Sequence, residues 1–290
     1  GNSIGGLTGS ELTCMVIGLL SGSLTSTPAF SAAKQTAASI AADTAMADHL
    51  EDLVTTGHAI SYIFGVIGVV LFVQIVPKLM RANMAEERKL LVAGEEEAEK
   101  KVEKNLIHFD HLGFAAFALA AIIGTIIGNI KIPMSAQGFS GTCFSLTTTG
   151  GCLLVSLVLG HFSRIGKINI MPNQSTLKLF RELGLVLFLV GAGIPGGAEF
   201  VENFDIMYFV YGIIMTIVPL VIGFLFAKYV LKLSLLNNLG SLTGGMTSTP
   251  ALGTLISTAG TEDVAAAYAA TYPIALIAVV LVSQFLIILF

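Results

Sequence analysis

The chain has 290 residues, of which 54% are hydrophobic and 12% are charged, and its net charge is −4. Soluble domains carry about 25% charged residues, so this composition, with a mean hydropathy of +0.84, excludes an ordinary cytosolic enzyme. No nucleic-acid partner is expected, because the charges lie almost entirely in the connections between apolar segments. Apolar runs of roughly 18 to 25 residues are typical of membrane-spanning helices. The chain is therefore predicted to be an all-α polytopic membrane protein surrounded by lipid.

Residues 1–80 form the first predicted membrane part. They contain the stretch GSLTSTPAF, from Gly22 to Phe30, and a predicted span over Ile60–Val76. Lys78 and Arg81 follow that span closely, and the positive-inside tendency therefore places the next segment in the cytoplasm.

Residues 81–108 are predicted to be a short charged cytoplasmic linker, because EERKLLVAGEEEAEKKVEK mixes acids and bases in the manner of a solvated helix. Residues 109–290 form the second membrane part. Its predicted spans are Leu112–Ile130, Phe144–His161, Leu183–Ile194, Met207–Phe226 and Ala265–Phe290.

Three polar places in this second part have a structural and a functional interpretation. SLTTTGG (Ser145–Gly151) and GAGIPGGAEF (Gly191–Phe200) either pack helices closely or contribute to a site. Arg181 and Glu182 are expected to anchor the start of a span at the membrane interface, with a role in substrate binding as the alternative.

The first motif returns as GGMTSTPAL, from Gly244 to Leu252, with Gly, Thr, Ser, Thr, Pro and Ala in the same places. Downstream, ISYIFGVIGVVLFVQ matches ATYPIALIAVVLVSQ, which aligns Tyr62 with Tyr272 and Gln74 with Gln284. Ordered matches of this kind predict an internal duplication. Because few residues precede its motif, we expect the first copy to be truncated at its front in this sequence.

The motif predicts a broken helix at membrane depth. Pro28 and Pro250 cannot donate a backbone hydrogen bond and would clash with the preceding turn, and the neighbouring glycines weaken the helix further. Backbone opened inside a membrane must be buried in protein or line a wet cavity. The N–H groups of a half-helix attract a carboxylate, and the opened carbonyls could hold a small cation. The alternative is a kinked helix whose hydroxyls only satisfy the backbone.

The candidate site follows from these motifs. The residues predicted to bind substrate are Thr25, Ser26, Thr27, Pro28, Thr247, Ser248, Thr249 and Pro250. Those predicted to support them are Gly22, Gly244, Gly245, Gln74, Gln284, Tyr62 and Tyr272.

Other chemistry is not indicated by the sequence. The cysteines and histidines lack convincing metal-ligand spacing, and no nucleophile–base pair stands out in the spans, so no metal site, cofactor or enzyme activity is expected. No predicted span carries a charged residue at mid-depth, which argues against a cation antiporter driven by a buried carboxylate. A coupling cation remains an open question. A channel is not indicated either, because no ring-like charged filter is visible.

The paired motifs resemble those of the bacterial aspartate–alanine exchanger family, as do FRELGLVLFLVGAGIPGGAEFV, TTGGCLLVSLVLG and TYPIALIAVVLVSQ. The resemblance covers nearly all of Gly18–Leu91 and Leu106–Phe290. It implies a secondary transporter of the bacterial inner membrane that exchanges aspartate for alanine or carries dicarboxylates such as succinate. It also implies two repeated halves, a core and a panel domain, elevator-like motion and a homodimer. Thr25–Pro28 and Thr247–Pro250 would be its crossing unwound segments.

The chain departs from the family pattern in two ways. Only Pro77–Asn105 stands where members commonly carry ligand-sensing domains, and the front of the first half is missing. We therefore expect either a fragment or a chain that needs another subunit. Charge counting places Asp43–Asp52 and Glu262–Asp263 both outside, whereas the resemblance suggests inverted halves. We expect inverted halves, because acids contribute little to orientation.

The functional hypothesis is an antiporter of small anionic or zwitterionic carboxylates or amino acids that works by alternating access. The alternative is a membrane sensor or regulatory subunit that binds a small carboxylate at the same site without transporting it.

Overall fold

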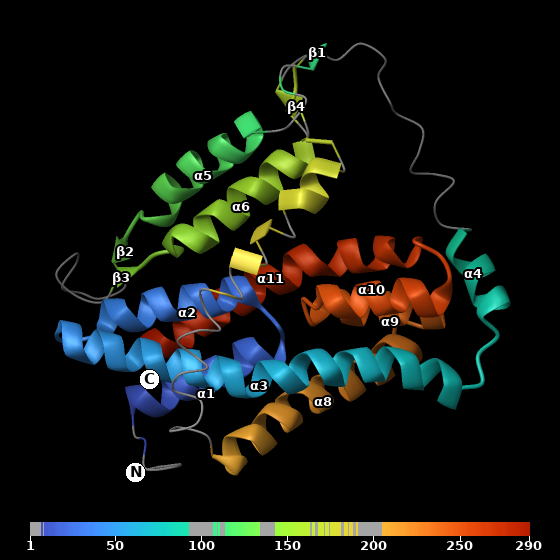
Figure 1. Cartoon of the computed structure of the whole chain (residues 1–290), viewed down its shortest axis with the longest axis horizontal. Helices are drawn as coiled ribbons and strands as arrows, with labels where there is room; N and C mark the ends of the chain where they lie inside the picture. The colour runs from blue at the N-terminus through green and yellow to red at the C-terminus, as the bar shows by residue number, and fades with distance from the viewer. Residues whose placement is uncertain are drawn as a thin grey trace.

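The computed structural model of the chain describes residues 7, 9–92, 107–108, 110, 114–133, 143–162, 164–165, 168–170, 172–173, 175–180, 183–184, 186–187, 190 and 205–290. The described part is almost entirely helical (Figure 1). The stretch GAGIPGGAEF, the pair Arg181 and Glu182, and most of the predicted span Leu183–Ile194 lie outside the described residues.

The helices are α1 (Ser10–Ser23), α2 (Thr27–Ile40), α3 (Thr44–Leu79), α4 (Met84–Val92), α5 (Phe114–Gly128), α6 (Thr147–Phe162), α8 (Ile206–Tyr229), α9 (Leu235–Gly245), α10 (Thr249–Ala259) and α11 (Val264–Leu289). The strands are β1 (Ile107–His108), β2 (Ile132–Pro133), β3 (Cys143–Phe144), β4 (Arg164–Ile165) and β5 (Ile168–Asn169). The strands pair in the order β1-β5-β4 and as β2-β3, and they only tie loops together.

Within the described part, 3 helices are long and apolar enough to cross a membrane: α3, α8 and α11. The predicted all-α polytopic membrane fold is thus confirmed. The sequence placed the start of α3 too late, at Ile60. The helix begins at Thr44, where the Asp43 carboxylate accepts a hydrogen bond of 2.8 Å from the N–H of Met46. Acidic residues in its first turns had interrupted the apolar run and hidden this start.

Two helix triplets, α1–α2–α3 and α9–α10–α11, have the same order and the same close contacts. A Cβ atom at Gly18 would meet the carbonyl of Val54 in α3. A Cβ atom at Gly240 would lie 2.8 Å from the carbonyl of Val264 in α11. In each triplet, small residues therefore let the first helix pack tightly along the third.

The triplets interlock and run in opposite directions. In Figure 1, α3 runs from left to right, whereas α11 runs from the right back toward the C-terminus on the left. The second helix of each triplet packs against the long helix of the other, α2 against α11 and α10 against α3. α8 lies along α3 and α1. This arrangement brings the two helix breaks to the middle of the molecule.

Helices α5 and α6 pack closely against each other, and α6 also packs against α2 and α11. Cβ atoms at Gly124, Gly128 and Gly151 would each meet backbone of the facing helix. Leu153 of α6 joins a small apolar cluster with Ala29 and Val280. The close-packing interpretation of the SLTTTGG stretch therefore holds at Gly151.

The helical part of the linker is docked onto the membrane helices rather than fully solvated. The Glu87 carboxylate accepts a hydrogen bond of 3.0 Å from the N–H of Leu235, at the start of α9. Leu91 is buried against the same core. The Arg88 guanidinium lies beside Gly260, where a Cβ atom would be 3.4 Å from Nη2. The linker and the Glu262 loop thus lie at the same end of the molecule.

Candidate functional site

The first TSTP motif forms a helix break with a regular backbone closure. Thr25 has φ 53°. Its N–H donates to the carbonyl of Gly22 at 2.9 Å, and the N–H of Ser26 donates to that of Ser21 at 2.8 Å. This pair of bonds is the Schellman closure of a helix C-terminus, in which the left-handed residue is usually glycine. The break is therefore made by Thr25.

The second motif repeats this closure residue for residue. Thr247 has φ 50°. Its N–H donates to the carbonyl of Gly244 at 3.0 Å, and the N–H of Ser248 donates to that of Thr243 at 3.0 Å. Matching residues in the two motifs therefore have matching backbone roles.

Thr25 and Thr247 join the two breaks. The Thr247 hydroxyl donates to the carbonyl of Leu24 at 2.8 Å, and the Thr25 hydroxyl donates to that of Met246 at a longer 3.5 Å. A β-branched residue in the left-handed region is strained by about 1–2 kcal/mol. Glycine would avoid the strain but has no hydroxyl, so this cross-link requires a residue whose side chain carries a hydroxyl.

The prolines do not open the helices, and this corrects the sequence analysis. Pro28 and Pro250 lie in the first turns of α2 and α10. Backbone N–H groups in the first turn of a helix have no intrahelical acceptor, so a proline there loses no hydrogen bond. The fixed φ of proline also suits the start of a helix. The expected clash with a preceding turn does not arise, because that turn has already ended at the threonine.

The last carbonyls of α1 are all used as acceptors. Those of Ser21 and Gly22 accept backbone N–H groups. The carbonyl of Ser23 accepts the Thr216 hydroxyl from α8 at 3.4 Å, and that of Leu24 accepts Thr247. The carbonyls from Ser21 to Leu24 are therefore all occupied, which leaves none of them unused for a cation.

Hydrogen-bond donors, in contrast, remain available on the other side of each break. Thr27 and Thr249, the first residues of α2 and α10, are partly exposed. Within the described residues neither their hydroxyls nor their N–H groups have a hydrogen-bond partner. The Ser26 hydroxyl caps α2 through the N–H of Ala29 at 3.4 Å. The Ser248 hydroxyl is buried and has no hydrogen-bond partner among the residues that the structure describes. The junction is thus rich in donors, which suits an anion.

The supporting glycines divide into two kinds. A Cβ atom at Gly22 would meet the carbonyl of His58 and the Ser61 hydroxyl. One at Gly244 would meet the Thr271 hydroxyl and the carbonyl of Tyr268. Gly245 has nothing within 4 Å of such an atom, so it is not needed for close packing.

The tyrosines lie near the breaks, and the two glutamines lie in different surroundings from each other. The N–H of Tyr62 is near Gly22, and Tyr272 stacks on Tyr268 with ring centroids 5.0 Å apart. Gln74 is exposed and lies about 18 Å farther along α3 at 1.5 Å per residue. Gln284 is fully buried and donates to the carbonyl of Ser145 at 3.0 Å. The structure therefore does not bring the two amides together.

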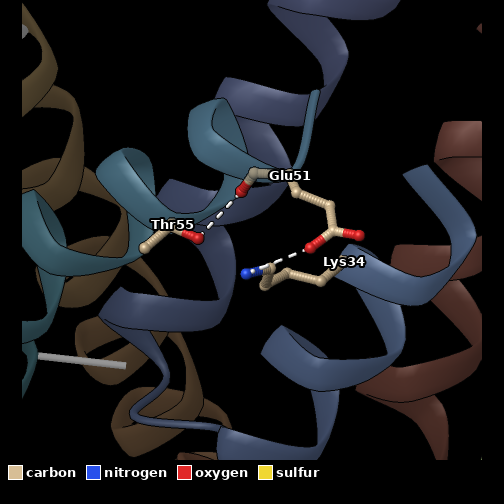
Figure 2. A network of polar contacts seen from close by, with 3 residues as sticks. All are labelled: Lys34, Glu51 and Thr55. Carbon is tan, nitrogen blue, oxygen red and sulfur yellow. Dashed lines mark hydrogen bonds and ion pairs between the residues drawn. The ribbon is translucent and has the colours of Figure 1, made fainter. Parts of the chain in front are cut away.

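A pair of charged side chains lies within the helices but outside the spans that the sequence predicted. Lys34 is in the interior of α2, and its Nζ is 3.2 Å from the Glu51 carboxylate of α3 (Figure 2). The Thr55 hydroxyl donates to the carbonyl of Glu51 at 2.8 Å. The sequence analysis missed this pair because α2 was treated as part of the motif segment and not as a helix.

Sequence comparison identifies the family. The profile of the aspartate–alanine exchangers, described as a predicted permease membrane region, matches residues 9–78 and 116–288. An uncharacterized transporter of Bacteroides fragilis is 34% identical over 203 residues, which cover 68% of this chain and 37% of that protein. An uncharacterized transporter of Rhodopirellula baltica is 32% identical over 205 residues, 68% of this chain and 38% of that protein.

The chain thus spans less than two fifths of the length of these curated relatives. No solved structure matches it. The gap in the family match falls on residues 79–115, which include the charged linker.

Proposed function

The chain belongs to the aspartate–alanine exchanger family, and from this premise we propose that it forms part of a secondary transporter. The proposed cargo is a small carboxylate or amino acid, such as aspartate, alanine or succinate. It is bound where the TSTP breaks meet and is exchanged across the bacterial inner membrane by alternating access.

The observation that carries this proposal is the imbalance of donors and acceptors at the junction. The carbonyls at the end of α1 are occupied, whereas Thr27 and Thr249 present donors on an accessible surface. Oxygen acceptors would suit a cation, and donors suit a carboxylate. We therefore assign Thr27 and Thr249 to the substrate, and Thr25 and Thr247 to holding the breaks together.

Helix dipoles add to this preference for an anion. In Figure 1, α2 and α10 start near the centre and run apart in opposite directions. Each helix N-terminus carries the equivalent of about +0.5 elementary charge. Two of them together balance about one carboxylate, and no described side chain at the breaks is charged.

In the proposed transport cycle, the two triplets form the moving core, and α5, α6 and α8 belong to the panel against which it slides. A homodimer, which would hold the panels together in the membrane, is part of the same proposal.

The test is counterflow in proteoliposomes that contain the full-length protein. Labelled aspartate, alanine and succinate are each offered outside vesicles loaded with the unlabelled compound. Accumulation of at least one label above that in protein-free vesicles is expected.

The variants locate the site. Thr27→Val and Thr249→Val remove one donor each with little change in volume, and each is expected to lower exchange at least tenfold. Thr258→Val, on the same helix α10 but two turns beyond the break, is the matched control and should exchange normally. Binding of the probes without accumulation would indicate the sensor instead of a transporter, and full activity of the double variant would refute the site.

A further inference from the structure

A hydrogen bond joins α11 to the turn that precedes α6. The Nε2 of Gln284 donates to the carbonyl of Ser145 at 3.0 Å. Beside it, a Cβ atom at Gly150 in the first turn of α6 would lie 3.6 Å from Cγ1 of Val280 in α11. In the proposed cycle α6 belongs to the panel and α11 to the moving core. The Gln284–Ser145 contact therefore crosses the surface along which the core slides.

This contact lies between the junction and one end of the molecule. Val280, one turn before Gln284, packs with Ala29 in the first turn of α2. Farther along, Ile288 of α11 and Ser39 of α2 line the same cavity, so the two helices run side by side in the same direction. Gln284 lies about 6 Å beyond Val280 along the helix axis. It is thus on the way from the junction to the end opposite the linker helix α4 (Figure 1).

A cavity of about 690 Å³ leads to the contact from that end. The ends of α2 and α11 line it, and so does Ser145, whose carbonyl accepts the bond from Gln284. Lys131 is the one charged residue among the described residues that line it. A positive charge in a cavity raises the local concentration of anions. The cavity therefore suits the approach of an anion, and it ends at the Gln284–Ser145 contact.

Two polar groups at the contact are buried without a partner. Gln284 is 0% exposed, and Thr147, the first residue of α6, is 7% exposed. In the part of the chain that the structure describes, neither the amide oxygen Oε1 of Gln284 nor the Thr147 hydroxyl has a hydrogen-bond partner. An unpaired buried polar group is costly, and it regains hydrogen bonds when water reaches it. The closed contact is therefore less stable than apolar packing would be at this place.

Thr147 has the backbone of the two junction threonines without their partners. Its φ is 61°, next to 53° for Thr25 and 50° for Thr247. The hydroxyls of Thr25 and Thr247 donate across the junction, whereas that of Thr147 meets no acceptor among the described residues. A strained threonine with an unused hydroxyl indicates that its partner, water or cargo, arrives in another state of the protein.

We propose that Gln284 is a gate residue that controls access of the cargo to the junction from the end that carries the Asp43 loop. The inference rests on the proposed function. In this structure the gate is shut. When the core slides against α6, the Gln284–Ser145 bond breaks and the cavity becomes continuous with the junction. The amide oxygen and the Thr147 hydroxyl then form hydrogen bonds with the entering water and cargo.

The sign of the effect of Gln284→Leu follows from this arrangement. Leucine keeps about the same size and removes both the bond to Ser145 and the unpaired oxygen. Its burial favours the shut gate, and its exposure disfavours the open one, which shifts the equilibrium about tenfold or more toward the shut state. In full-length protein, counterflow of aspartate, alanine or succinate, whichever is exchanged, should therefore be at least tenfold slower. The melting temperature should equal or exceed that of the wild type, whereas a merely structural amide would give a lower one.

Access to the junction is measured with Thr27→Cys in a protein in which Cys14, Cys143 and Cys152 are replaced. An impermeant methanethiosulfonate is added on the side of the membrane from which Ala42→Cys reacts. Adding Gln284→Leu should slow the labelling at least fivefold.

Asn129→Leu is the matched control for this substitution. Its amide donates to the carbonyl of Thr125 at 2.8 Å and to the Thr148 hydroxyl at 3.4 Å, within the α5–α6 pair. The change from amide to leucine is the same, but these two bonds do not cross to the core. Labelling of Thr27→Cys and exchange should both stay as in the parent protein.

Cross-linking tests whether the contact opens during transport. Ser145→Cys with Gln284→Cys, in the absence of the native cysteines, is joined by a short bifunctional thiol reagent. Exchange should fall at least tenfold and return when a reductant cleaves the link. The control joins Thr125→Cys to the native Cys152, whose Sγ lies 3.9 Å from the Thr125 hydroxyl within the α5–α6 pair. That link should leave exchange unchanged.

The outcomes are separable. Full exchange by the cross-linked Ser145–Gln284 pair, or unchanged labelling in Gln284→Leu, overturns the gate and leaves the transporter intact. Failure of Gln284→Leu to fold, or a lower melting temperature, overturns it as well, because the shut state should be at least as stable with leucine. Absence of exchange for aspartate, alanine and succinate in the wild type overturns the proposed function and this inference together.

Discussion

Thr25 and Thr247 show how a strained residue can be selected for its hydroxyl. Both have a left-handed backbone, and both donate across the junction to the other break. Sequence comparison of the two motifs identified these threonines as important. It assigned them to the substrate together with Thr27 and Thr249, because a residue's φ and burial cannot be read from the order TSTP. The left-handed φ identifies Thr25 and Thr247 as the residues that join the breaks, and distinguishes them from the two threonines that we assign to the substrate.

The first prediction concerns this cross-link. Thr247→Val leaves the carbonyl of Leu24 without its 2.8 Å hydrogen bond, which should cost about 1–3 kcal/mol of unfolding free energy. Thr247→Ser keeps the hydroxyl and removes the β-branch, so its stability should equal or exceed that of the wild type. Thermal unfolding in detergent measures both variants. Equal melting temperatures for Val and Ser would contradict the proposed cross-link.

The second prediction uses two adjacent glycines as matched variants. Gly244→Ala forces a Cβ atom against Tyr268 and Thr271, and overpacking of this kind costs about 1–3 kcal/mol. Gly245→Ala places its Cβ in open space and should be neutral, or stabilising by up to about 1 kcal/mol through helix propensity. The same unfolding assay compares them. Similar losses of stability in the two variants would mean that the close contact at Gly244 does not constrain the motif.

At the scale of elements, the sequence was most informative where apolar periodicity was unbroken. The cores of α8 and α11 were located to within a few residues, because their spans contain few polar interruptions. The start of α3 and the helix α2 were missed, because Lys34, Asp48 and Glu51 made them resemble loops. Those charges are tolerated where Lys34 pairs with Glu51, a tertiary contact that no local pattern predicts.

The third prediction concerns the linker helix α4. Glu87 supplies the missing cap of α9, whose own N-cap residue Ser234 makes no side-chain cap bond. Glu87→Ala should therefore destabilise the first turn of α9 by about 1 kcal/mol, which is roughly a fivefold faster amide exchange. Glu86→Ala, one residue earlier, is the control. Hydrogen exchange read by mass spectrometry over Leu235–Leu239 tests this. Equal protection in both variants would show that the cap contributes nothing.

At the scale of the molecule, the interlocked triplets bear on two competing predictions of orientation. Charge counting alone placed the Asp43 and Glu262 loops on the same side of the membrane. The opposite directions of α3 and α11, and the contact of Arg88 with Gly260, support inverted halves instead. The resemblance to the exchanger family had favoured this arrangement before any contact was known. The pairing of α2 with α11 and of α10 with α3 depends on long-range packing, which the sequence does not encode locally.

The fourth prediction is the sidedness of these loops. In the full-length protein with its other accessible cysteines replaced, Ala42→Cys should react with an impermeant maleimide added to intact cells. Thr261→Cys should react only after the membrane is permeabilised. Labelling of both cysteines in intact cells would indicate parallel halves and contradict the inverted arrangement.

The central claim is that a small carboxylate binds between the first residues of α2 and α10. The most direct measurement is protection of Thr27→Cys from a thiol reagent by substrate, in a variant in which Cys14, Cys143 and Cys152 are replaced. The account predicts that whichever of aspartate, alanine or succinate exchanges will slow the labelling of Thr27→Cys at least fivefold and leave the control Thr258→Cys unchanged. Labelling of Thr27→Cys at the same rate with and without a transported substrate would contradict it.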